Sequence, residues 1–138
     1  MVSLVFDHIG IIVKKLDKGV EQFRKFHANL SWSEVYEEPY QDVFVRFGAD
    51  YNALRYEVIA PRSPNSPIMN SLKKNVNLLN HLAYRVPSME EAQQYFSDCM
   101  SMLITQAHES NVFNNSLIQF WKIPHGLIYE LIEDTSLR

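Results

Sequence analysis

Apolar and polar positions follow two periods along this chain, and these periods predict its elements. Residues 4–13 are rich in Val, Ile and Phe, which is typical of a β-strand. From Leu16 the apolar residues recur at helical spacing, which predicts an amphipathic helix over 16–27 with Asp17 as its cap. Three strand-like stretches follow, at 31–36, 43–47 and 53–59, with breaks at 37–39 and 48–52. The pattern therefore predicts a βαβββ module.

The second half of the chain repeats this plan after a Pro-rich linker at 61–67. A short helix over 68–74 and a polar turn at 75–77 lead into a strand over 81–86. The next helix should begin after Ser88, with Glu91 completing a capping box. The remaining predictions are strands at 103–107, 117–121 and 127–132, a polar loop that holds His108, a loop at 111–115, a turn at 124–126 and a tail from 134 that frays.

One constant shift along the sequence aligns the two halves (81 − 8 = 73, and 130 − 57 = 73). It aligns His8 with His81, Val13 with Val86, Phe23 with Phe96, Phe47 with Phe120, and Glu57 with Glu130. Self-similarity of this kind indicates a tandem repeat. We therefore predict one α+β domain made of two βαβββ modules, at 1–60 and 79–134, joined by a linker at 61–78. Their mixed sheet is expected to curl into an open cup.

Composition narrows the class of protein. The apolar share of 46% is that of a packed globule. Thirteen basic and 16 acidic residues give a net charge of −3 without a basic run, which argues against a nucleic-acid partner. No apolar stretch approaches the length of a membrane span, and no secretory signal is visible. The lone Cys99 excludes an internal disulfide framework, so we expect a cytoplasmic protein.

Each predicted module carries one His on its first strand and one Glu on its last: His8 and Glu57, then His81 and Glu130. Taken singly, such a His is most often a hydrogen-bonded core residue, and such a Glu can face solvent on a half-exposed strand. Two modules usually pack about a pseudo-twofold axis, which would bring equivalent residues together. Two imidazoles and two carboxylates suit one divalent ion such as Zn, Co, Mn, Ni or Fe.

Two arginines are candidates for substrate binding. Along their strands Arg85 has the parity of His81, and Arg55 has the parity of Glu57. An inward guanidinium would suit an anionic group on a small-molecule substrate. Exposure at the edge of the sheet is the alternative for both.

The segments 6–11, 80–86 and 129–133 resemble the vicinal oxygen chelate superfamily, which includes glyoxalase I, extradiol dioxygenases, methylmalonyl-CoA epimerase and bleomycin-resistance proteins. The sequence of residues 56–68 is most similar to the methylmalonyl-CoA epimerase branch. This resemblance places metal ligands on His8, Glu57, His81 and Glu130. It implies a metal-stabilised enolate of an acyl-CoA or related thioester, with a carboxylate moving the α-proton.

The chain also departs from that branch. Epimerases usually have His-His where this chain has Asn80-His81. Some are thought to place a carboxylate base on the strand matching 43–47, but here Asp42 only precedes that strand. The proton would then be moved by a metal-site carboxylate, Glu130 first and Glu57 second.

Three functions follow from the resemblance. The first is a metal-dependent isomerase or epimerase. The second is another metal-dependent activity of the superfamily, a glyoxalase-type lyase or a dioxygenase. The third is a binding protein of the bleomycin-resistance type, which needs no metal. Members of the superfamily often dimerise, so a homodimer is expected.

Overall fold

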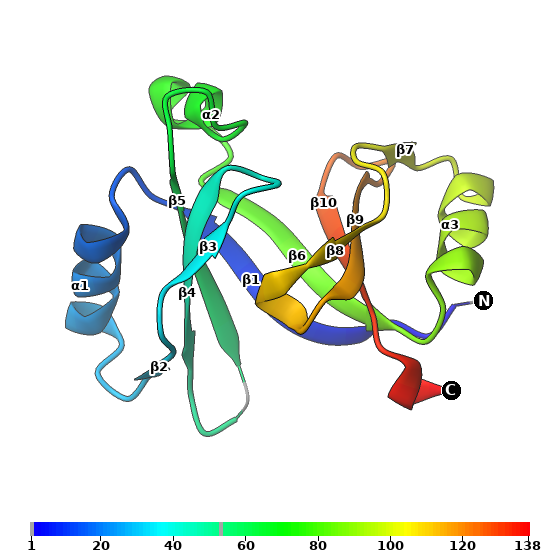
Figure 1. Cartoon of the computed structure of the whole chain (residues 1–138), viewed down its shortest axis with the longest axis horizontal. Helices are drawn as coiled ribbons and strands as arrows, with labels where there is room; N and C mark the ends of the chain where they lie inside the picture. The colour runs from blue at the N-terminus through cyan, green and yellow to red at the C-terminus, as the bar shows by residue number, and fades with distance from the viewer. Residues whose placement is uncertain (1, 53) are drawn as a thin grey trace. The chain divides into compact units, whose positions relative to one another are not determined.

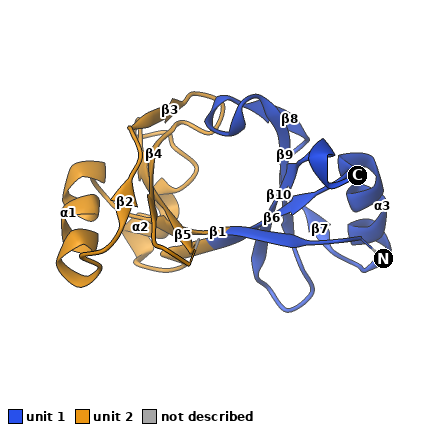
Figure 2. Ribbon diagram, turned by 90° about the horizontal axis from the view of Figure 1, so that it is seen from below, with its two compact units in different colours: residues 1–7, 81–138 blue, residues 8–80 orange. Residues whose placement is uncertain are grey.

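The computed structural model describes residues 2–52 and 54–138. These residues form a mixed α+β fold of ten strands and three α-helices, in the order drawn in Figure 1. They divide into two compact units (Figure 2): unit 2 spans 8–80, and unit 1 combines 1–7 with 81–138. The α+β class predicted from the sequence is confirmed. The predicted division at 1–60, 61–78 and 79–134 stays a prediction.

Unit 2 contains most of strand β1 (Val5–Ile12), helix α1 (Leu16–Phe26) and helix α2 (Met69–Lys74). Its other strands are β2 (Ser31–Trp32), β3 (Tyr36–Glu38), β4 (Val43–Ala49) and β5 (Arg55–Pro61). They pair in the order β2-β4-β5-β1, with β3 also paired to β4. Strand β1 runs parallel to β5, whereas β4 runs antiparallel to it.

Unit 1 contains most of strand β6 (Leu79–Val86) and helix α3 (Met89–Asp98). Its other strands are β7 (Met102–Leu103), β8 (His108–Ser110), β9 (Ser116–Lys122) and β10 (Ile128–Glu133). They pair in the order β6-β10-β9-β7, with β8 also paired to β9. Strand β10 runs parallel to β6 and antiparallel to β9, so unit 1 repeats the pairing of unit 2.

The repeat seen in the sequence is present in the strand register. Glu57 lies opposite Gly10 of β1, and its repeat counterpart Glu130 lies opposite Ala83 of β6. On their other sides, Glu57 lies opposite Phe47 and Glu130 opposite Phe120, which are again repeat counterparts. Side chains at directly paired positions share one face of a sheet. Each glutamate is therefore fixed on a defined face by two neighbouring strands.

The helix of each unit packs on the opposite face of its sheet. In unit 1, α3 buries Met89, Ala92 and Phe96 against Val86 and Leu131. Ser88 caps this helix as predicted, since its hydroxyl accepts a hydrogen bond from the backbone N–H of Glu91. In unit 2, α1 presents Val20 to the core.

Helix α1 begins differently from the prediction. Its N-cap is Lys15, and Asp17 lies within the first turn, where its carboxylate accepts from the N–H of Lys18. Strand β5 continues through Pro61, the residue expected to open the linker. The predicted start of this strand at Ala53 lies outside the described residues.

Two predicted strands are interrupted. The stretch 31–36 divides into β2 and β3, because Ser33 turns its carbonyl to the Nε of Arg46. The strand then continues through Glu37-Glu38, which were expected to break it. The stretch 103–107 is not one strand either, because the Thr105 hydroxyl accepts the N–H of Phe120 and replaces a backbone ladder bond.

Three further segments also differ from the predictions. His108, expected in a loop, lies on β8. The expected loop at 111–115 contains a 3₁₀ turn (Asn111–Phe113) that the Ser110 hydroxyl caps. The tail also forms a 3₁₀ turn (Thr135–Leu137), and the Nε of Arg138 donates to the Pro87 carbonyl at 2.9 Å. Side-chain hydrogen bonds, which hydropathy does not reveal, hold both segments.

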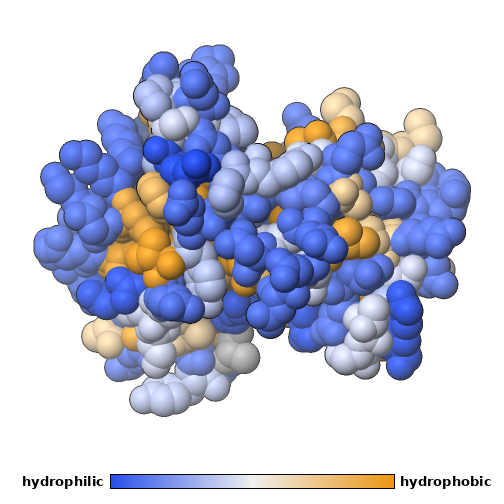
Figure 3. Space-filling view, viewed as in Figure 1, coloured by the Kyte–Doolittle hydropathy of each residue, from blue (hydrophilic) through white to orange (hydrophobic). Residues whose placement is uncertain are grey.

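Hydrophilic side chains predominate on the face drawn in Figure 3, and apolar side chains show there only in small patches. Of the helices in the described part of the chain, none has the length and apolar character needed to cross a membrane.

Candidate functional site

Four buried residues carry metal-ligating atoms: His8, Glu57, His81 and Glu130. They form one His–Glu pair in each unit. In unit 2 the Nε2 of His8 lies 3.3 Å from a carboxylate oxygen of Glu57. In unit 1 the Nε2 of His81 lies 3.2 Å from the corresponding oxygen of Glu130. The residue types and the repeat shift selected these four residues, and their role as metal ligands stays a prediction.

The two pairs also have the same aromatic neighbour. The ring of His8 meets Phe47 edge to face, with ring centres 5.5 Å apart. The ring of His81 meets Phe120 in the same way, at 5.4 Å. These contacts orient each imidazole within an apolar strand surface, so that Nε2 and the carboxylate oxygen face the same space.

The spacing within each pair fits two ligands of one ion. Divalent ions bind His nitrogen and carboxylate oxygen at about 2.1 Å, so neighbouring ligand atoms lie about 3.0 to 3.4 Å apart. A charge-assisted hydrogen bond from a protonated His would usually be shorter, about 2.7 to 2.9 Å. The residues at both pairs therefore fit a metal ion, and buried carboxylates are otherwise uncommon in apolar strands.

Unit 2 carries a further buried carboxylate that the sequence did not single out. Glu38 of β3 is only 3% exposed and lies opposite Val43 of β4. Through the β4–β5 register, Glu38 and Val43 share the face of Phe47 and Glu57. The neighbouring Tyr36 meets Phe47 edge to face on this same side. Tyr36 and Glu38 are two residues apart, so strand alternation would have placed Glu38 on this face. Because Glu37-Glu38-Pro39 was interpreted from the sequence as a break, Glu38 was not found.

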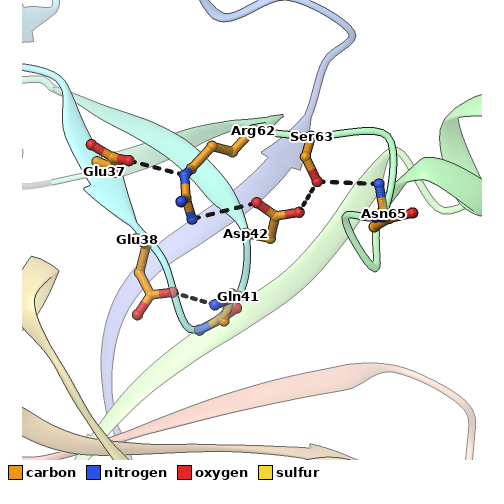
Figure 4. A network of polar contacts seen from close by, with 7 residues as sticks. All are labelled: Glu37, Glu38, Gln41, Asp42, Arg62, Ser63 and Asn65. Atoms are coloured by element: carbon orange, nitrogen blue, oxygen red, sulfur yellow. Dashed lines mark hydrogen bonds and ion pairs between the residues drawn. The ribbon is translucent and has the colours of Figure 1, made fainter.

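A polar network holds the turn that carries Glu38 (Figure 4). The backbone N–H of Gln41 donates to one oxygen of Glu38 at 2.5 Å. Beside it, the Arg62 guanidinium contacts Glu37 at 2.9 Å and Asp42 at 3.5 Å. The Ser63 hydroxyl donates to Asp42, and the N–H of Asn65 donates to Ser63. The turn is thus held by a backbone hydrogen bond to Glu38 and by the contacts of Arg62 and Ser63 with Asp42.

Unit 1 has a serine where unit 2 has this glutamate. Ser110 of β8 lies opposite Ser116, which is the repeat counterpart of Val43 (116 − 43 = 73). Ser110 is also buried, but its hydroxyl caps the following 3₁₀ turn. The buried carboxylate therefore has no counterpart at this register position.

The two predicted substrate-binding arginines have different surroundings. The Arg55 guanidinium lies over the Phe47 ring, 4.6 Å from its centre, on the face that carries His8 and Glu57. Arg85 makes ion pairs with Asp134 at 2.8 Å and Asp7 at 3.5 Å.

The fold agrees with a comparison to known families. The family model of the glyoxalase/bleomycin resistance protein/dioxygenase superfamily matches residues 7–118. This chain belongs to that superfamily. No curated protein matches the chain.

Solved structures of similar fold include methylmalonyl-CoA epimerases. The enzyme from Mycobacterium tuberculosis is 25% identical, with 94% of this chain and 87% of that chain covered and a TM-score of 0.80. A hypothetical protein from Bacillus halodurans is 26% identical, with 96% and 95% covered and a TM-score of 0.81. A Streptomyces coelicolor methylmalonyl-CoA epimerase in complex with 2-nitronate-propionyl-CoA is 22% identical, with 97% of each chain covered and a TM-score of 0.81.

Proposed function

We propose that this protein is a metal-dependent epimerase or isomerase that exchanges the α-proton of an acyl-CoA or related thioester. The observation that carries the proposal is the pair of matched His–Glu contacts, one in each unit, in a fold similar to methylmalonyl-CoA epimerases. A likeness of 25% identity supports the reaction class, and the acyl group is left to experiment.

In this proposal, His8, Glu57, His81 and Glu130 together hold one divalent ion, such as Zn, Co, Mn, Ni or Fe. Two nitrogens and two oxygens leave coordination positions for substrate oxygens. When bound, the ion would act as a Lewis acid that stabilises negative charge on the thioester oxygen. A phenylalanine ring packs edge to face on each of these histidines, whose side chains are buried.

The chain's own carboxylates would move the proton. Glu130 and Glu57 were the predicted candidates, but as metal ligands both would have to leave the ion to accept it. Glu38 adds a carboxylate outside this ligand set. The Gln41 N–H occupies one of its oxygens and leaves the other to take the α-proton and return it.

Arg55 is the better placed of the two arginines to bind an anionic group of the substrate. Its guanidinium lies on the ligand-bearing face of unit 2, stacked on Phe47. Arg85 makes ion pairs with Asp134 and Asp7 within its own unit and is proposed second.

Two measurements on the same variants test the proposal. Elemental analysis should find about one divalent ion per wild-type chain, and less than a tenth of that in His81→Ala and Glu130→Ala. Deuterium incorporation from D₂O into methylmalonyl-CoA and other acyl-CoA thioesters should depend on that metal. Glu38→Gln should keep the metal and lose exchange, whereas Ser110→Ala should keep both.

The other functions of the superfamily give different results in these assays. Oxygen consumption with a bound Fe(II) would indicate a dioxygenase, although the second carboxylate, Glu57, speaks against the two-His, one-carboxylate set of such enzymes. Hemithioacetal turnover would indicate a glyoxalase-type lyase. A wild type that takes up no metal after reconstitution with each of the five ions would refute the enzyme proposals and leave the binding protein. The homodimer and the cytoplasmic location stay predictions.

A further inference from the structure

Unit 2 carries a cluster of hydrogen-bond donors on the face of its sheet that α1 covers. Arg24 of α1 and Arg46 of β4 both lie against the indole of Trp32 on the edge strand β2. Their guanidinium carbons are 5.8 and 5.9 Å from the centre of the Trp32 ring. Among the residues that the structure describes, neither arginine makes an ion pair with a carboxylate.

The Trp32 indole N–H belongs to the same cluster. It is shielded from solvent and finds no hydrogen-bond acceptor within residues 2–52 and 54–138. A buried donor left in this state destabilises the folded protein, so an acceptor that reached it would be bound favourably. The one hydrogen bond of the Arg46 side chain runs from Nε to the Ser33 carbonyl, so its terminal nitrogens, like the guanidinium of Arg24, have no acceptor in the described part of the chain. The indole N–H of Trp32 and the guanidinium groups of Arg24 and Arg46 thus belong to one cluster in which the described residues supply no acceptor to the indole N–H, to the guanidinium of Arg24 or to the terminal nitrogens of Arg46.

The other unit shows what is missing. There the indole N–H of Trp121 donates to the Gln119 side chain at 2.9 Å. The repeat counterpart of Gln119 in unit 2 is Arg46 (119 − 46 = 73). A glutamine carries an acceptor oxygen, whereas an arginine carries only donors. Unit 2 therefore replaces the acceptor of this arrangement with a second positive donor.

The cluster is held in place by its surroundings. Trp32 pairs with Gly48 across β2 and β4, and a Cβ at position 48 would lie 3.0 to 3.1 Å from three atoms of the indole. Phe23 meets the indole edge to face at 6.2 Å. The bond to Ser33 fixes the Arg46 side chain. Trp32 and Arg46 are thus held in place before any ligand arrives, and the exposed side chain of Arg24 is the group that a bound anion would order.

We propose that Trp32, Arg24 and Arg46 form an oxyanion-binding site that takes a phosphate group. Two guanidiniums can hold a tetrahedral anion by paired charge-assisted hydrogen bonds, and the indole N–H supplies a third donor as the anion draws the side chains together. The chain as a whole has a net charge of −3, so this local charge of +2 does not follow from a generally basic surface. The site lies on the opposite face of the sheet from His8 and Glu57, so it does not depend on the proposed enzyme activity.

Trp32 can report on the site. The chain has two tryptophans, so Trp121→Phe leaves Trp32 as the only indole fluorophore. Titration with inorganic phosphate at constant ionic strength should change its emission saturably, and sodium chloride should not. Arg24→Gln and Arg46→Gln should each weaken binding at least tenfold, the loss of one charge-assisted contact. Arg62→Gln is the matched control, because it removes an equal charge from an arginine that already has acidic partners. It should leave the affinity for phosphate unchanged.

Calorimetry on the protein with both tryptophans checks the same affinities if Trp121→Phe perturbs the core. Adenosine 3′,5′-bisphosphate provides a second arm. Tighter binding than inorganic phosphate would show that the site takes the phosphate of a larger molecule, and equal or weaker binding would show that it takes the free ion. A non-saturable response, an equal response to chloride, or unchanged affinity in both arginine variants would overturn the proposal.

Discussion

Units 1 and 2 each pack a helical phenylalanine against an indole, but the two indoles come from different strands. In unit 1, Trp121 of β9 lies 5.7 Å from Phe96 of α3. In unit 2 the corresponding residue of β4 is Gly48, and the ring of Trp32 from edge strand β2 covers it, 6.2 Å from Phe23. The same backbone fold therefore fills the space between helix and sheet in two ways, and in each case an indole ring packs against the phenylalanine of the helix.

The opposite faces of the two sheets differ less. The His–Glu and His–Phe distances agree between the units to about 0.1 Å. Beside them, Glu38 in unit 2 and Ser110 in unit 1 correspond in register but not in chemistry. Repeated geometry suits ligands that share one ion, whereas proton transfer needs a group on one side. Under the proposed function, the differences between the units therefore mark where the proton-transferring group should be sought.

The largest expected effect tests that asymmetry. Glu38→Gln keeps the size and the hydrogen-bond acceptor but removes the proton-accepting charge. We expect α-proton exchange to fall by about 10²- to 10⁴-fold, the usual contribution of a positioned acid or base. Ser110→Ala should change the rate less than about threefold. Rates come from deuterium incorporation, with metal content measured on the same samples. Full activity in Glu38→Gln would show that Glu38 is not the proton acceptor and would favour Glu130 or Glu57 in that role.

The paired phenylalanines give the next effect. Phe96 is 5% exposed and also contacts Tyr129, so Phe96→Ala should lower the free energy of unfolding by about 3–5 kcal/mol. Phe23 is only half-buried, and Phe23→Ala should cost roughly half as much because less apolar area leaves the core. Urea titrations followed by circular dichroism measure both. Equal losses of unfolding free energy would show that Phe23 packs against Trp32 as tightly as Phe96 packs against Trp121.

A third comparison concerns the helix–strand contact. Position 19 is glycine where unit 1 has Ala92, and a Cβ at Gly19 would lie 2.6 to 2.9 Å from the branched side chain of Val13. Gly19→Ala should therefore destabilise by about 1–3 kcal/mol through overpacking, despite a gain in helix propensity of about 1 kcal/mol. Adding Val13→Ala should recover part of the loss. A stabilising Gly19→Ala would show that the helix can move away from β1.

The sequence predicts the fold well because the fold is repeated, and the same repeat shift selects the four buried His and Glu residues, whose role as metal ligands stays a prediction. The repeat shift aligns strand centres, and buried strands have clear apolar patterns. The prediction is weaker where a single hydrogen bond decides the outcome. The Thr105 hydroxyl ends one strand, and the Ser33 carbonyl divides another. Hydropathy cannot show which side chain takes a backbone partner.

Glu38 was missed for a related reason. Two acidic residues before a proline are typical of a loop, and only pairing with Val43 makes Glu38 a buried strand residue. The arginines differ in the same way. Parity placed Arg55 and Arg85 on the ligand-bearing face of each strand, but the acids that pair with Arg85 lie far away in sequence or beyond the last strand. Such long-range partners have no signal in a single sequence.

The smallest expected effect comes from an ion pair of unit 1 whose two positions carry no charge in unit 2. Arg85 and Asp134 correspond to Ile12 and Pro61 in unit 2. The Ser136 hydroxyl and then the Arg85 guanidinium hold the pKa of the Asp134 carboxyl below its ordinary value. The folded-state pKa is the lower one, so this contribution is complete above the ordinary pKa of about 4 and is lost as the pH falls through the folded-state pKa.

Asp134→Asn should therefore cost no more than about 1 kcal/mol at pH 7, and the gap to wild type should close on acidification. Urea titrations between pH 7 and pH 2 measure that gap. Because the Ser136 hydrogen bond lowers the pKa more than Arg85 does, Ser136→Ala should remove more of the pH dependence than Arg85→Gln. The reverse order would make the ion pair the main contact that holds the end of the chain, and a gap that stays constant with pH would mean that Asp134 acts through packing.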